Sequence, residues 1–170
     1  MTEEERKSTS FLGTPLDNKS FLSVPRTHAK FDASFDFQTV PKNPEKQNAR
    51  TDGHPWQILL ELVGDTMQPQ AFAIYGDVVV GSNTQEDPDL DINLVNWHGY
   101  NRGVSRRHAM LRPSRHKLFI LDLRSTNGTH INGLPLGVGW AYALQDSDLI
   151  TLAQLHLRFR LYRAPADFEE

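Results

Sequence analysis

Short apolar runs separated by turn residues fill the chain from Pro55 onward, and this pattern limits the possible folds more than any other feature. In the run from Leu155 to Tyr162, the apolar positions alternate with polar ones and are held by Leu155, Leu157, Phe159 and Leu161. Successive side chains of a strand point to opposite faces, so this alternation predicts a strand with one buried face. No long helical period and no internal repeat is found beside these runs. The sequence therefore predicts an all-β sandwich of short strands.

The other apolar runs predict further strands at residues 57–63, 71–75, 78–80, 91–94, 108–112, 117–122, 129–131 and 149–152. The pairs Gly64-Asp65 and Gly76-Asp77 end two of these runs and resemble hairpin turns. The connections 82–91, 95–107 and 133–147 are longer than simple hairpins. Binding residues usually lie on such loops, because a rigid β scaffold can hold them in place.

The first 54 residues have a different character. They are rich in Ser, Thr, Asn, Lys and Pro with isolated phenylalanines, and they show neither a helical nor an alternating apolar period. Such a composition buries too little apolar surface to offset the entropy of ordering. We therefore expect a disordered tail over residues 1–54, a single β domain over residues 55–163 and a short C-terminal tail over residues 164–170.

Composition excludes several classes of function. The chain has no cysteine, which rules out disulfides, thiol nucleophiles and thiolate metal sites. The formal net charge of -3 gives no overall attraction to nucleic acid or to an anionic membrane. The acidic start, Met1 to Arg6, is followed by no apolar run of the kind that forms a secretory signal or a membrane span. We expect a cytoplasmic protein.

The patterns of an enzyme are also missing. A catalytic site needs a nucleophile with a base, a pair of carboxylates or a metal-binding cluster, and the sequence contains none of these in the required spacing. The seven histidines occur singly, and Ser105 is not part of a Gly-x-Ser-x-Gly turn. We expect no catalysis, no cofactor and no metal.

Four blocks resemble, in order, the signature of forkhead-associated (FHA) domains: Val80-Gly81-Ser82, then 103–108 (GVSRRH), 122–129 (DLRSTNGT) and Ile131-Asn132-Gly133. The resemblance extends from about Trp56 to Tyr162. It implies a SMAD/FHA-like β-sandwich of eleven strands that binds phosphothreonine peptides without catalysis. The arrangement with an N-terminal tail is similar to that of small bacterial FHA regulators.

The residue types in these blocks suit a phosphopeptide. Ser105 offers a hydroxyl and Arg106 a planar cationic group, and both make strong hydrogen bonds to phosphate oxygens. Thr126 offers a second hydroxyl from a neighbouring loop. Asn127 carries both a donor and an acceptor, which suits it to hold the backbone of an extended peptide. The resemblance implies these same roles at the four matching positions.

Other residues of the signature have structural interpretations. Gly128 and Gly133 are interpreted as turn glycines with positive φ. The resemblance implies that His108 braces the loop that carries the serine, and Asn132 is expected to bond the turn backbone. Gly81 is also assigned to the scaffold.

Ser82 is a departure from the family pattern. The family commonly has Gly-Arg where this chain has Gly81-Ser82, and the arginine contacts the phosphate. Losing one charge-assisted hydrogen bond costs about 1.5–3 kcal/mol. Ser82 is retained as a candidate phosphopeptide contact, and Arg102, Arg107 and Arg124 are the candidates to replace the missing cation.

The tail contains two candidate phosphorylation sites, Thr9 and Thr14. Leu12 follows Thr9 within a Ser-Thr-Ser-Phe-Leu segment, and Asp17 stands three residues after Thr14. Phosphorylation by a Ser/Thr kinase adds about -1.5 to -2 charges, which can turn a tethered tail into an intramolecular ligand. The sequence therefore raises the hypothesis of self-binding.

The predicted function is thus phosphothreonine-peptide binding in Ser/Thr kinase signalling, with a phosphorylated protein and a kinase as partners and neither nucleic acid nor membrane. The main alternative is a phosphate-independent interaction module, because Ser82 replaces an arginine. A weaker alternative is nucleic-acid binding through the basic residues between Arg102 and Lys117, which lack an interleaved aromatic platform.

Overall fold

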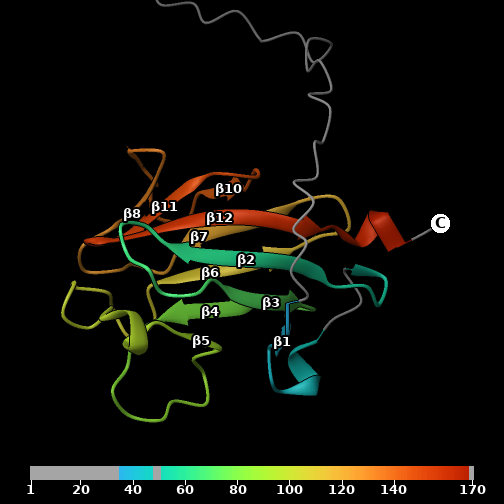
Figure 1. Ribbon diagram of the computed structural model, residues 1–170, viewed down its shortest axis with the longest axis horizontal. Coiled ribbons are helices and arrows are strands. Elements are labelled where there is room, and N and C mark those ends of the chain that lie inside the picture. Colours follow the sequence, from blue (N-terminus) through green and yellow to red (C-terminus); the bar gives the residue numbers. More distant parts are fainter. Residues whose placement is uncertain (1–34, 48–50, 169–170) are drawn as a thin grey trace, which may run out of the picture. The chain divides into compact units, whose positions relative to one another are not determined.

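The computed structural model describes residues 35–47 and 51–168, which form two packed β-sheets (Figure 1). One sheet has seven strands in the order β1-β3-β2-β12-β11-β8-β9, and the other has five in the order β10-β7-β6-β4-β5. The strands are β1 (Gln38–Val40), β2 (Trp56–Leu62), β3 (Gln70–Ile74), β4 (Val78–Gly81), β5 (Ile92–Asn93), β6 (Ala109–Pro113), β7 (Leu118–Asp122), β8 (Thr129–Ile131), β9 (Leu134–Pro135), β10 (Ala141–Ala143), β11 (Leu149–Leu152) and β12 (Leu155–Arg163). Short 3-10 helices are formed by Pro44–Lys46, Val95–Trp97 and Pro165–Phe168. The all-β fold class is confirmed.

The core lies between the two sheets and follows the alternation of the strands. Leu155, Leu157 and Phe159 of β12 are each at most 1% exposed, so the face predicted from the sequence is the buried one. Leu111 of β6 and Ile120 of β7, in the other sheet, are buried in the same core. Alternating strand patterns therefore identify the core.

All nine strands predicted from apolar runs are present, and each predicted boundary agrees with the observed one to within one residue. The strands missed by the sequence are short and lie at sheet edges: β1, β9 and β10. Two of them fall within residues 133–147, which had been expected to form a loop. The described residues therefore contain twelve strands and not the eleven that the family resemblance implied.

The hairpin predicted at Gly76-Asp77 is wrong. The strands on either side of it, β3 and β4, belong to different sheets, so the chain crosses the sandwich at this point. Gly76 forms an isolated bridge with Gln47, and a side chain at Gly76 would overlap the Lys46 carbonyl. The glycine is needed for this close contact with a distant segment, which a local turn pattern cannot reveal.

The tail predicted over residues 1–54 is too long. Residues 38–40 form β1, which pairs in parallel with β3, and Val40 is only 1% exposed. The ring centroids of Phe35 and Phe37 lie 6.1 and 5.1 Å from that of Tyr162 on β12. These contacts between distant segments order a stretch whose own sequence has no strand period. Residues 1–34 lie outside the described part.

The C-terminal tail predicted over residues 164–170 is also corrected. Ala164 and Pro165 are buried, and the Ala164 amide donates to Asp167 Oδ2 at 2.8 Å. The Arg163 guanidinium stacks 3.7 Å from the centre of the Phe168 ring. Residues 164–168 therefore belong to the folded domain, and residues 169–170 lie outside the described part.

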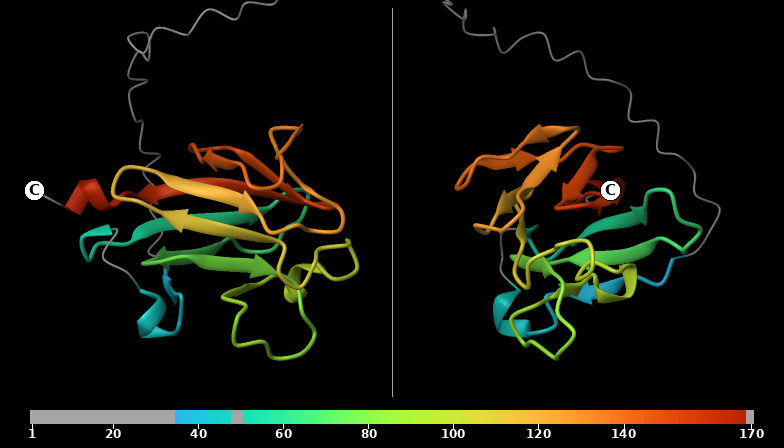
Figure 2. Two further views of the ribbon diagram at one scale, coloured as in Figure 1. Left: turned by 180° about the vertical axis from the view of Figure 1, so that it is seen from behind. Right: turned by 90° about the vertical axis from the view of Figure 1, so that its left-hand side faces the viewer.

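Several loops gather at one end of the sandwich, which faces the viewer on the right of Figure 2. Ala109, the first residue of β6, pairs with Asp122, the last residue of β7, so the loops before β6 and after β7 lie at the same end. The Gln154 amide, between β11 and β12, donates to the Arg102 carbonyl at 3.1 Å. This end, here called the loop end, carries the predicted phosphopeptide residues. Among the described residues, none of the helices has the length and apolar character needed to span a membrane.

Candidate phosphopeptide site

Two loops at the loop end are held together by direct hydrogen bonds. The Thr126 amide donates to Ser105 Oγ at 3.1 Å, and Asn127 Nδ2 donates to the Gly103 carbonyl at 2.9 Å. Gly103 has φ of +78°, and a side chain on it would lie 2.7 Å from Asn127 Nδ2. The fold therefore brings Ser105, Thr126 and Asn127 together, as predicted.

The His108 ring contacts the backbone of both loops. Its side chain is wholly buried, its Nδ1 lies 3.0 Å from the Ser105 amide, and its Nε2 lies 2.9 Å from the Gly128 carbonyl. An amide can only donate and a carbonyl can only accept, so the neutral ring must carry its hydrogen on Nε2. Burial lowers the pKa of His108 below its ordinary value of 6.5, which favours this neutral form.

Asp122 shapes the second loop. It accepts hydrogen bonds from Ser125 Oγ at 2.6 Å and from Thr129 Oγ1 at 2.7 Å. Burial by itself raises the pKa of Asp122, but these bonds and the nearby His108 outweigh burial, so the pKa lies below its usual value. Ser125 Oγ in turn accepts the Gly128 amide at 3.0 Å. The loop that carries Thr126 and its neighbour Asn127 is thus held as a rigid turn.

Ser105 is partly exposed and Arg106 is exposed, so both residues have donor groups that solvent can reach. Ser105 Oγ accepts the Thr126 amide, which leaves the hydroxyl hydrogen for another acceptor. Arg106 is exposed, and its backbone is fixed because its carbonyl packs against Gly81, where any side chain would overlap it. Such an arrangement of a hydroxyl and an exposed guanidinium suits an anionic ligand.

Comparison with known proteins agrees with this geometry. The family model of the FHA domain matches residues 78–153. FraH of Nostoc sp. is 38% identical over 72 residues, an alignment that covers 42% of this chain and 24% of FraH. The chain therefore spans about a quarter of the length of that relative. The chain contains an FHA domain.

Solved FHA domains share the fold. One, from a study of phosphothreonine-dependent FHA domain interactions, is 26% identical with a TM-score of 0.50, and the match covers 63% of this chain and 98% of that one. The FHA domain of CT664 from Chlamydia trachomatis is 22% identical with a TM-score of 0.51, covering 63% and 99% of the two chains. Full-length yeast Pml1p is 18% identical with a TM-score of 0.53, covering 69% and 96%. The last two similarities concern the fold alone.

The FHA domain does not present Ser82 to a ligand. Ser82 is wholly buried, its amide donates to the Ser105 carbonyl at 3.1 Å, and its hydroxyl has no hydrogen-bond partner among the described residues. The backbone of Gly99 covers it, because a side chain on Gly99 would lie 3.0 Å from Ser82 Oγ. The prediction of Ser82 as a phosphopeptide contact is therefore wrong for this structure, since the loop over it closes the position.

Asn132 has the predicted structural role. It has φ of +52° and precedes Gly133, whose φ is +83°. Its Oδ1 accepts the Leu149 amide at 2.9 Å, and its Nδ2 donates to Asp148 Oδ1 at 2.8 Å. These bonds tie the β8–β9 turn to the start of β11. Gly128 has φ of +82°, so both turn glycines are confirmed.

Sequence reasoning missed Gly99, Gly103 and Asp122 as positioning residues. Asp122 is part of the block that resembles the family, and a carboxylate followed by Ser125 was a usable signal for a capped turn. The roles of Gly99 and Gly103 depend on contacts with Ser82 and Asn127, which no local pattern reveals. Thr9 and Thr14, the candidate phosphorylation sites, lie outside the described residues.

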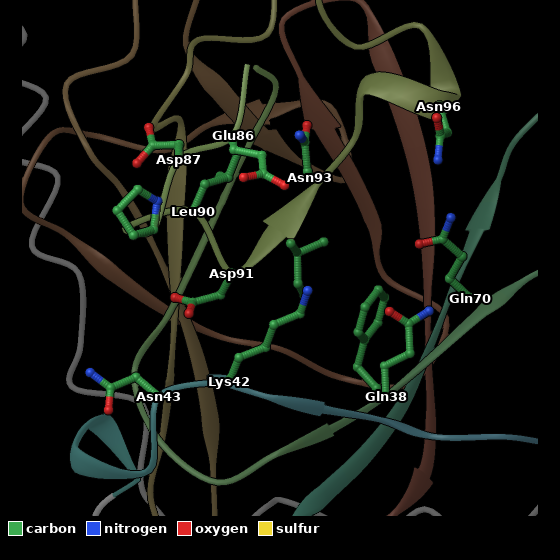
Figure 3. A pocket seen from close by; sticks show the side chains of 13 residues that line it. Gln38, Lys42, Asn43, Gln70, Glu86, Asp87, Leu90, Asp91, Asn93 and Asn96 are labelled. Carbon is green, nitrogen blue, oxygen red and sulfur yellow. The ribbon is translucent and has the colours of Figure 1, made fainter. Parts of the chain in front are cut away.

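A cavity of about 660 Å³ lies elsewhere on the domain (Figure 3). It opens between the segment around Gln38 and Lys42 and the β4–β5 loop, which contributes Glu86, Asp87 and Asp91. None of the residues predicted to bind a phosphopeptide lines it. Within the described ranges, no group of three or more His, Asp and Glu side chains is placed to hold a metal ion.

Proposed function

We propose that the FHA domain binds phosphothreonine segments of partner proteins in Ser/Thr kinase signalling, with Ser105, Arg106 and Thr126 on the phosphate and Asn127 on the peptide backbone. The hydrogen bond from the Thr126 amide to Ser105 Oγ carries the proposal, because it joins the two loops and leaves a donor for phosphate. FHA domains are binding modules. The 26% identical solved domain, from work on phosphothreonine-dependent interactions, supports the same reading.

Four arginines provide the local positive charge. Arg102, Arg106, Arg107 and Arg124 lie in the two site loops or next to them. Arg102, Arg107 and Arg124 are therefore the candidates for the second cation that the family commonly has where this chain has Ser82.

The test is a titration of the full chain with matched threonine and phosphothreonine peptide libraries. Arg106→Ala removes the proposed phosphate contact and is expected to weaken phosphopeptide binding by about 10- to 100-fold. Arg115→Ala is the matched control, because it removes the same charge from the β6–β7 turn at the opposite end, where Arg115 pairs with Asp52 at 3.1 Å. The control should bind as the wild type does.

Equal affinity of the wild type for both libraries would contradict the proposal. That result would favour the phosphate-independent interaction module, for which the missing arginine at Ser82 is the sequence argument. Tight binding of DNA or RNA that falls steeply with salt would favour the nucleic-acid alternative.

A finer proposal is that phosphorylated Thr9 or Thr14 is one ligand of the same site. The described chain begins with Phe35 and Phe37 against Tyr162, near the end of β12 that lies away from the site. The nine residues of β12 span about 30 Å, whereas the 20 residues between Thr14 and Phe35 span up to about 70 Å when extended. Tail length therefore permits self-binding at high effective concentration.

Kinase treatment followed by mass spectrometry tests this finer proposal. Phosphorylated wild-type chain should bind an added phosphopeptide at least about tenfold more weakly than a Thr9→Ala, Thr14→Ala chain treated in the same way. No phosphate on either threonine, or equal affinities of the two chains, would contradict self-binding without affecting the peptide-binding proposal.

A further inference from the structure

Most of the large exposed apolar side chains of the domain lie at the loop end. Among the described residues, the large apolar side chains with substantial exposure are Val63, Met67, Tyr100, Leu134, Val138 and Trp140. All of them except Leu134, on the edge strand β9, lie in loops at the loop end. Trp140 is 73% exposed and Val138 is 59% exposed, which is unusual for side chains of this size. Their neighbourhood therefore calls for a functional explanation.

Val138 and Trp140 belong to a rigid turn, Gly137–Trp140, here called the Trp140 turn. The Trp140 amide donates to the Gly137 carbonyl at 3.0 Å, and Gly139 has φ of +79°, as the third residue of a type II turn requires. The indole packs on Gly137, where a side chain would lie 2.9 Å from Trp140 Cδ1. The side chains are thus presented in a defined geometry, so little conformational entropy is lost when a ligand packs on them.

The Trp140 turn is anchored directly beside the loop of Thr126. On one side the Leu136 amide donates to the Thr129 carbonyl at 2.8 Å, and on the other Ala141 pairs with Leu121. Thr129 stands three positions after Thr126, which limits that path to about 11 Å. An extended peptide rises about 3.3 Å per residue, so residues two to four positions from a bound phosphothreonine lie roughly 7–13 Å away. The turn is within reach of the same peptide.

The two sides of this surface differ in charge. Residues 131–145, which include the Trp140 turn, contain no charged side chain. The loops on the other side of Thr126 carry Arg102, Arg106 and Arg107. A ligand that complements both sides places an anionic group on the arginines and an apolar group on the Trp140 turn.

We propose that the Trp140 turn is a second part of the peptide-binding surface and selects partners with a large apolar residue two to four positions from the phosphothreonine. This inference rests on the proposed function above and names the partner class for that site. A second copy of the chain fits this surface less well. A tryptophan side chain buries at most about 250 Å², whereas a stable interface buries about 800 Å² on each partner.

The experiment is selection from a degenerate phosphothreonine peptide library by the full chain. The wild type should enrich Phe, Leu, Ile, Met or Trp at one or more positions two to four residues from the phosphothreonine. Trp140→Ser should abolish this enrichment and weaken the best apolar peptide by about tenfold, the lower end for an apolar side chain in a pocket. Trp140→Phe should retain most of the enrichment, because it keeps a large apolar side chain. This result would show that apolar contact, and not a feature specific to tryptophan, selects the peptides.

Val63→Ser is the matched control for the loss of an exposed apolar residue. Val63 follows β2, and β12 and β11 separate β2 from β8 in the sheet, a distance of about 14 Å across three strand spacings. The control should select the same peptides as the wild type. Circular dichroism and thermal melts of all variants verify that the exposed substitutions leave the fold intact.

The inference and the proposed function fail in different ways. No apolar enrichment by a wild type that still prefers phosphothreonine, or the same enrichment by Trp140→Ser, would overturn the inference and leave the proposed function standing. Dimerisation of the wild type, or binding to anionic vesicles, that is lost in Trp140→Ser without any change in peptide selection would also overturn it. If the wild type shows no preference for phosphothreonine over threonine peptides, the proposed function on which the inference rests is overturned.

Discussion

Burial decides which polar side chains of the FHA signature can meet a ligand. Ser82 and His108 are both wholly buried, yet His108 has two hydrogen-bond partners and Ser82 Oγ has none among the described residues. Ser105 is partly exposed and Arg106 is exposed, so a ligand can reach them. A polar residue type therefore indicates a ligand contact only when the side chain is also exposed in the fold.

Ser82→Ala provides a test at this scale. A buried hydroxyl without a partner contributes a desolvation cost of about 1–3 kcal/mol, so its removal should leave the free energy of unfolding unchanged or raise it slightly. Phosphopeptide affinity should stay within about twofold of the wild type. Urea unfolding and peptide titration measure the two quantities, and a tenfold loss of affinity would show that Ser82 does reach the ligand.

The pH dependence of stability tests His108. Its folded-state pKa is lowered by burial below 6.5, so the unfolded chain takes up the proton first. The free energy of unfolding should therefore fall as pH decreases from about 6.5 towards the folded-state pKa, with a slope of up to about 1.4 kcal/mol per pH unit. Urea unfolding between pH 7.5 and 5 measures this slope. His108→Gln should lose this part of the dependence, and identical slopes for the two proteins would contradict a buried neutral His108.

At the scale of elements, the edge strand β1 extends the seven-stranded sheet beyond the part that the family signature marks. It contributes Val40 to the core and pairs with β3 over three residues. Phe35 and Phe37 add aromatic contacts with Tyr162. Residues 35–47 are thus a structural part of the domain.

Two truncations separate these roles. Removal of residues 1–34 should leave the unfolding midpoint near that of the full chain. Removal of residues 1–47 deletes β1 and exposes the core beneath Val40, and should cost about 2–4 kcal/mol of unfolding free energy. Equal midpoints for both truncations in chemical denaturation would show that β1 contributes nothing to stability.

The charge of the whole molecule differs from that of its loop end. The chain has a net charge of -3, whereas the loops around Ser105 carry Arg102, Arg106, Arg107 and Arg124. Attraction of a phosphopeptide is therefore local, and it acts between partly exposed charges that salt screens.

Phosphopeptide affinity should accordingly decrease by about 3- to 10-fold between 50 and 500 mM NaCl, because the screening length shortens over this range. The decrease should be smaller in Arg106→Ala than in the wild type, and unchanged in Arg115→Ala. Isothermal titration at several salt concentrations measures the slopes. Equal slopes in the wild type and Arg106→Ala would remove Arg106 from the phosphate contact.

The sequence by itself determined the features that depend on local periodicity and on residue type. Alternation in the run from Leu155 predicted β12 and its buried face, because a strand has a period of two residues and turn residues mark its ends. The resemblance of the two loop blocks to the FHA signature implied that Ser105 and Thr126 belong to one site.

Only the tertiary structure decided the features that depend on contacts between distant segments. Examples are the pairing of β1 with β3 and the crossing at Gly76. The closure of Ser82 beneath Gly99 and the hydrogen bond from Leu136 to Thr129, which anchors the Trp140 turn, also join segments that are separated in the chain. The physical reason is that burial and register are set by non-local pairing. A short strand or a loop serine has the same local sequence whether it is covered or exposed.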